Sequence, residues 1–131
     1  MQKEDSYHIR KVQEVIIYIE EHLNEHLDLN TIAGKACLSL YHFHRIFKKY
    51  QNENLYSFIQ RKRVEKALEL IRNHKDLYLY EIAIDCGFST QALFIKAFKR
   101  YYGTTPHEFR KEISMNNQIV NKNKKKNWTK I

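Results

Sequence analysis

Residues 29–48 read LNTIAGKACLSLYHFHRIFK, and residues 79–99 repeat this pattern as LYEIAIDCGFSTQALFIKAFK. The Ile-Ala pair returns after 50 positions and the second phenylalanine after 51, so the second copy contains one inserted residue. In each copy two phenylalanines lie four residues apart, which places both on one face of a helix. Each copy therefore predicts a short helix, a turn and a second helix. In such a helix-turn-helix the second helix is the type that enters a DNA major groove.

The turn between the two helices also repeats. Ala33 and Ala83 are small enough to let the two helices of each motif approach closely. A serine follows each turn, and we expect the hydroxyls of Ser39 and Ser89 to cap the second helices. A tetratricopeptide-type repeat is the alternative for paired helices, but its period is about 34 residues.

The rest of the chain also favours helices, because 131 residues contain only 3 Gly and 1 Pro. We expect a first helix at about 7–25, a linker helix at about 55–74 and a last helix opened by Thr105 and Pro106. Together with helix-turn-helix motifs at about 29–50 and 79–102, this predicts an all-α fold of seven helices. The linker helix, about 30 Å long, would join two subdomains across nearly one DNA turn of about 34 Å.

The positive charge is concentrated in particular segments. Residues 29–52 and 86–107 contain no Asp or Glu, although the whole chain has 15 acidic residues. We expect a folded domain over residues 1–113 and a flexible basic tail over residues 114–131, which are rich in Asn and Lys. The acid-free windows predict a surface that faces phosphate.

Further motifs sharpen this interpretation: FHRIFKK at 43–49, CGFS at 86–89 and FKRYYGTTP at 98–106, followed by Phe109-Arg110. With the two Ile-Ala pairs, and over residues 8–111, they resemble the DNA-binding domain of AraC/XylS-type transcription regulators. The resemblance implies a sequence-specific regulator of double-stranded DNA that inserts its third and sixth helices into successive major grooves. It also implies an activator that contacts RNA polymerase.

Candidate DNA-contacting residues follow from the exposed faces of these two helices and from the resemblance. Arginine can bond guanine as a fork, glutamine suits adenine, and histidine can donate to or accept from a base edge. The expected base-contacting residues are Tyr41, His44 and Arg45 in the first motif and, as their equivalents, Thr90, Gln91, Leu93 and Lys96 in the second. The expected phosphate-contacting residues are Leu40, Lys48, Lys49, Lys99, Arg100 and Thr105.

Two further expectations concern the balance between the motifs. Ala92 and Leu93 are less polar than is common at these family positions, so we expect the first motif to discriminate more between sequences. Arg63 matches an arginine of the family's linking helix. For this residue we favour pairing or packing between the two halves over phosphate contact.

Other functions find little support in the sequence. There is no glycine-rich phosphate loop and no Gly-x-Ser-x-Gly elbow, and His22 and His26 lack the Glu that a zinc protease has directly after its first His. We therefore expect no enzyme activity, no metal and no cofactor, and free thiols at Cys37 and Cys86. No apolar run approaches the 18 or so residues of a membrane span, so we expect a cytoplasmic protein without membrane contact.

Three alternatives remain open. Because one chain contains two reading motifs, we expect it to bind DNA as a monomer. It could be a complete stand-alone activator or the DNA-binding module of a longer, effector-responsive regulator. A helical adaptor that binds another protein is the alternative of a different class, and it predicts binding that is insensitive to salt. RNA binding would need an exposed aromatic platform, for which Tyr41 and Tyr50 are thin support.

Overall fold

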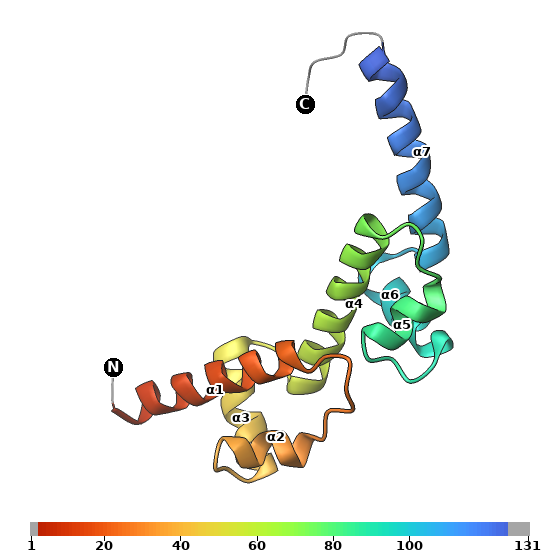
Figure 1. Cartoon of the computed structure of the whole chain (residues 1–131). Helices are drawn as coiled ribbons and strands as arrows, with labels where there is room; N and C mark the ends of the chain where they lie inside the picture. Colours follow the sequence, from red (N-terminus) through yellow and green to blue (C-terminus); the bar gives the residue numbers. More distant parts are fainter. Residues whose placement is uncertain (1–2, 126–131) are drawn as a thin grey trace.

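The computed structural model describes residues 3–125, with side chains described from residue 6 to residue 116. Over residues 3–125 the chain forms seven α-helices and no strand: α1 (Lys3–Glu21), α2 (Leu29–Lys35), α3 (Leu40–Gln51), α4 (Leu55–Asn73), α5 (Leu79–Asp85), α6 (Gln91–Tyr102) and α7 (Pro106–Lys125). α1, α2 and α3 gather at one end of α4, and α5, α6 and the start of α7 gather at the other (Figure 1). The all-α fold with two helix-turn-helix subdomains and a linker helix is confirmed.

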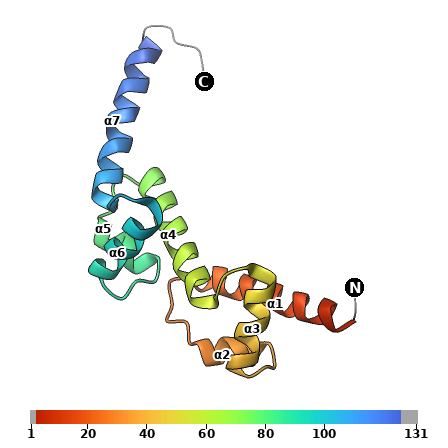
Figure 2. The ribbon, with the colours of Figure 1, turned by 180° about the vertical axis from the view of Figure 1, so that it is seen from behind.

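The buried side chains form two separate hydrophobic clusters, one in each half. Phe43 and Phe47 of α3 are fully buried in the first cluster, and Phe94 and Phe98 of α6 are fully buried in the second. α4 takes part in both: Leu55, Phe58 and Ile59 pack into the first cluster, and Val64, Ala67 and Ile71 into the second. The view from behind shows the helices of the two halves beside different parts of α4 (Figure 2).

The two turns share an unusual backbone conformation. Each passes through the left-handed region, at Cys37 with φ +59° and at Gly87 with φ +94°. In the second turn the N–H of Phe88 donates to the carbonyl of Ala83 at 3.0 Å, which closes the turn. At the offset of 50, Cys37 therefore corresponds to Gly87, and Cys86 corresponds to Ala36.

The caps of the second helices correct one prediction. Ser39 caps α3 as expected, since its hydroxyl accepts from the N–H of His42 at 3.2 Å. The cap of α6 is Thr90, whose hydroxyl accepts from the N–H of Leu93 at 3.1 Å. The prediction of Ser89 was wrong because the inserted residue lies before the cap. The second helices therefore align with an offset of 51 throughout.

The two ends of the chain also differ from expectation. α1 begins at Lys3 and ends at Glu21, so it lies about four residues earlier than predicted. α7 continues to Lys125 and replaces the irregular chain that the sequence predicts from residue 114. Neither Gly nor Pro occurs in residues 107–125 to interrupt this helix. Residues 126–131 of the predicted tail lie outside the described residues.

Gly87 offers a test of how closely the two halves pack. A Cβ atom at this position would lie 1.9 Å from the carbonyl oxygen of Leu23, and its φ of +94° disfavours a side chain. We expect Gly87→Ala to lower the free energy of unfolding by about 2 kcal/mol or more in urea titration. Gly34→Ala is the control: nothing lies within 4 Å of its Cβ, and alanine should stabilise α2 by up to about 1 kcal/mol. Equal effects of the two variants would contradict the close contact.

The corrected cap gives a second test. We expect Thr90→Ala to lower the free energy of unfolding by about 1 kcal/mol, because the N–H of Leu93 loses its partner. Ser89→Ala, one residue earlier, should change it by less than about 0.5 kcal/mol. Thermal unfolding of both variants against the unaltered protein checks the assignment, and a larger loss for Ser89→Ala would refute it.

Candidate nucleic-acid interface

The outer face of α3 lies opposite its buried phenylalanines. Tyr41, 74% exposed, stands near the start of this face, followed by Arg45 one turn later and Lys48 and Lys49 in the last turn. The hydroxyl cap at Ser39 fixes where the helix begins, and the buried positions Phe43, Ile46 and Phe47 fix its rotation. The predicted residues Tyr41, Arg45, Lys48 and Lys49 therefore lie together on one exposed surface, and His44 lies half-buried at its edge.

The outer face of α6 repeats this arrangement with different side chains. Gln91 and Leu93, the latter 50% exposed, lie in its first turn, and Lys96 follows one turn later. Lys99 and Arg100 are exposed in the last turn, at the positions of Lys48 and Lys49. All the predicted positions of the second motif except Thr105 thus lie on α6 or at its cap.

The offset of 51 changes which positions of the two motifs correspond. Arg45 is equivalent to Lys96, but His44 is equivalent to Ile95, which is 36% exposed, and Leu93 is equivalent to His42. His42 is exposed on α3 and was missed by the sequence reasoning. Continuing the offset of the phenylalanines through the helix would have found it.

The electrostatics of both faces favour an anion. Neither α3 nor α6 has an acidic residue in its first turn, and both have two basic residues in the last turn. The Arg45 guanidinium lies over the ring of Tyr41, 5.9 Å from its centroid. Among the described residues Arg45 forms no ion pair, so its forked donors remain available to a base edge or a phosphate.

The basic side chains of α4 are used differently. Arg61 donates to Glu53 at 2.6 Å and to Glu65 at 3.0 Å, and the hydrogen bond with Glu53 raises the pKa of its guanidinium. Lys62 lies 3.5 Å from Glu20 of α1. These pairs neutralise Arg61 and Lys62 in the middle of α4, whereas among the described residues Arg45 of α3 and Lys96 of α6 have no such acidic partner.

Three of the predicted contacts are engaged within the protein itself. Leu40 is half-buried and packs against the first cluster, so it can offer a phosphate only its backbone N–H. Thr90 caps α6, and the Thr105 hydroxyl accepts from the N–H of Glu108 at 3.1 Å to cap α7. The Glu108 carboxylate accepts from the hydroxyl of Thr104 at 3.2 Å and lies in the first turn of α7, where it competes with a phosphate.

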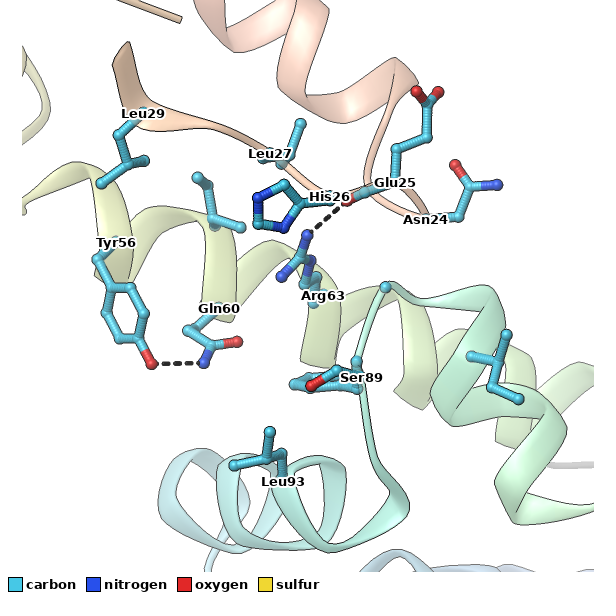
Figure 3. A pocket seen from close by; sticks show the side chains of 14 residues that line it. Asn24, Glu25, His26, Leu27, Leu29, Tyr56, Gln60, Arg63, Ser89 and Leu93 are labelled. Carbon is cyan, nitrogen blue, oxygen red and sulfur yellow. Dashed lines mark hydrogen bonds between the residues drawn. The ribbon is translucent and has the colours of Figure 1, made fainter. Parts of the chain in front are cut away.

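A cavity of about 580 Å³ lies between the two halves (Figure 3). The loop after α1, the side of α4 and the turn before α6 line it, with His26, Gln60, Arg63, Phe88 and Leu93 among the contributors. The Arg63 guanidinium reaches from α4 to the loop after α1, and burial lowers its pKa. Arg63 therefore links α4 to the first half by hydrogen bonds to backbone carbonyls, in line with the role between the halves that the sequence suggested.

The described part of the chain also contains metal-ligating residue types and two free cysteines. Within it, no three metal-ligating side chains gather. Cys86 is buried, and burial raises the pKa of its thiol to about 12, so the thiol stays protonated at neutral pH. No helix in residues 3–125 has both the length and the apolar composition needed to cross a bilayer.

Comparison with known proteins agrees with the helix-turn-helix fold. A family described as "Helix-turn-helix domain" matches residues 32–112. The regulatory protein PocR of Salmonella typhimurium is 36% identical over 109 residues, which are 83% of this chain and 36% of PocR. The TetD protein of transposon Tn10 from Escherichia coli is 33% identical over 105 residues, 80% of this chain and 75% of TetD. The chain thus spans about a third of PocR and most of TetD.

Among solved structures, the DNA-binding domain of the global transcriptional factor AdpA, in complex with a target DNA, superposes with a TM-score of 0.77. It is 28% identical, and the match covers 80% of this chain and 94% of that one. The repeated motifs, the basic outer faces and these relatives agree. The chain belongs to the AraC/XylS family of DNA-binding transcription regulators.

Proposed function

We propose that the protein inserts α3 and α6 into two successive major grooves on one side of a DNA duplex. The observation that carries this proposal is the pair of exposed, acid-free outer faces, one in each of the two halves that share α4. α4 has 19 residues and is therefore about 28 Å long, close to the roughly 34 Å that separate successive major-groove faces. That AdpA's related domain was solved with a target DNA supports the proposal.

The two faces would contribute unequally to sequence reading. α3 offers the Arg45 fork, together with His42, His44 and Tyr41, to base edges and thymine methyls. α6 offers Gln91 and Lys96 as its polar readers, while Ala92, Leu93 and Ile95 supply apolar contacts. We therefore expect α3 to carry more of the hydrogen-bonded discrimination. The cations in the last turns would position the protein on the phosphates.

We propose further that one chain suffices for one site and that the protein activates transcription. Two reading heads in a single chain remove the need for a dimer to span two half-sites.

On α1, Glu14, Ile17 and Glu21 lie on the face opposite the buried Val12, Val15 and Ile19, and Ile17 is 56% exposed. This acidic face with an apolar centre is our candidate contact for RNA polymerase, because it is directed away from the first core and lies on neither reading helix.

Arg45 provides the direct test of sequence reading. We expect selection from a random duplex library to yield a defined site, and Arg45→Ala to lose about 1–3 kcal/mol of discrimination at one base pair. Titration of the selected duplex and its single-base variants at several salt concentrations measures this loss.

Lys48→Ala is the matched control for Arg45→Ala, since it also removes one exposed cation from α3. We expect it to weaken binding to all sequences alike and to reduce the salt slope by about one. If Arg45→Ala does the same, Arg45 is a phosphate contact. If the unaltered protein binds every duplex equally, the specific-regulator proposal fails; binding that ignores salt would favour the protein-binding adaptor.

A further inference from the structure

The two halves of the protein are joined by more than the continuous α4. The Arg63 Nε donates to the carbonyl of Leu23 at 3.1 Å, and its Nη2 donates to the carbonyl of Glu25 at 2.9 Å. Both carbonyls belong to the loop between α1 and α2 and therefore to the first half. Arg63 projects from α4 (Figure 3). It directly precedes Val64, the first α4 residue buried in the second core.

The turn of the second motif meets this loop at the same place. A Cβ on Gly87 would lie 1.9 Å from the Leu23 oxygen and 2.7 Å from the Arg63 Nε. The absence of a side chain at Gly87 is therefore what lets the second turn touch the first half. Loop, α4 and turn converge on the one carbonyl of Leu23, and we call this meeting point the Arg63 junction.

The junction supports α4 where neither core does. The first core takes α4 residues up to Ile59 and the second begins at Val64, so residues 60–63 lie between the two cores. The cavity of about 580 Å³ lies beside this stretch and leaves one side of it unpacked. Another link, the Tyr101 hydroxyl donating to the carbonyl of Ser57 at 3.2 Å, ties α6 to α4 but does not reach the loop after α1. Arg61 and Lys62 of this stretch pair with Glu53 and Glu20, which belong to the first half. Arg63 is the residue of this stretch that binds the loop after α1 at the point where the second turn touches it.

We infer that the Arg63 junction fixes the distance and rotation between α3 and α6, and that Arg63 thereby sets which half-site spacing the protein accepts. This inference rests on the proposed two-headed binding. One base pair more or less between half-sites moves the second groove by about 3.4 Å and turns it by roughly 34°. A rigid junction excludes such sites. A loosened junction tolerates them but lowers the affinity for the best site, because the two heads are no longer held in the binding geometry beforehand.

Arg63 acts here through the positions of the two heads and not by touching DNA. Its Nε and Nη2 already donate hydrogen bonds to backbone carbonyls of the protein. A phosphate contact would instead leave the spacing preference unchanged and would appear in the salt dependence.

The experiment uses the tightest duplex selected by the full chain, rebuilt with the distance between its half-sites changed by −1, 0, +1 and +2 base pairs, together with a duplex that keeps only one half-site. Arg63→Ala and Arg63→Lys are compared with the unaltered protein. Lys66→Ala is the matched control: it removes a cation from the same helix that also donates to a backbone carbonyl, that of Asp85 at 3.0 Å, but within the second half.

We expect the unaltered protein to prefer its best spacing over the next by about tenfold or more, and both Arg63 variants to reduce this ratio to about threefold or less. Arg63→Lys should not restore the ratio, because one ammonium does not reproduce the fork that holds two carbonyls. Lys66→Ala should keep the preference of the unaltered protein. Affinity for the single half-site should stay within about twofold in every variant, which shows that the head that binds this half-site is folded.

An unchanged spacing ratio in Arg63→Ala overturns the inference. So does an equal loss of affinity at every spacing, with a salt slope reduced by about one and restored in Arg63→Lys, because that result identifies a phosphate contact. A protein that binds all duplexes equally before any substitution overturns the proposed function as well, which keeps the two failures apart.

Discussion

The packing of α4 into two hydrophobic cores at once is the constraint on which the rest of this structure depends. Leu55 and Phe58 are buried in one core, and Val64 and Ile71 in the other, so neither half can complete its core without this helix. Each such side chain contributes about 1.5–3 kcal/mol when fully buried. The helix therefore stabilises both halves and determines how they are placed relative to each other, and the Arg63 junction restrains the short stretch between the cores.

Duplication explains how one chain obtains two similar surfaces with different chemistry. The turn with positive φ, the hydroxyl cap and the left-handed residue at the end of the second helix, Asn52 or Gly103, recur in both motifs. These features fix where each second helix starts, stops and faces. Residues on the outer faces are not buried in either core, so their side chains can differ between the two motifs, as Arg45 and Lys96 do. A shared scaffold with unlike outer faces fits the proposed recognition of two different half-sites.

Much of this was predictable, because repeated spacing and hydrophobic periodicity follow from local geometry. Seven helices, the caps at Ser39 and Thr105 and the exposure of Arg45 and Gln91 needed no tertiary information. Both Ser89 and Thr90 can cap, and the offset of 50 at the Ile-Ala pair points to Ser89 whereas the offset of 51 at the phenylalanines points to Thr90. His42 was missed because the offset of 51 was not continued through the second helix. The helix beyond residue 113 was missed because Asn and Lys have no strong helical pattern. The contact of Gly87 with Leu23 joins residues 64 positions apart, which no local pattern reveals.

The central claim is that one chain places two reading helices on one side of a duplex, a single turn apart. Hydroxyl-radical footprinting of the selected site, with the number of chains per duplex measured in the same sample, tests it most directly. The account predicts two protected patches on one face, about 10 to 11 base pairs apart, at one chain per duplex. A single patch, or two patches that require two chains, would contradict it.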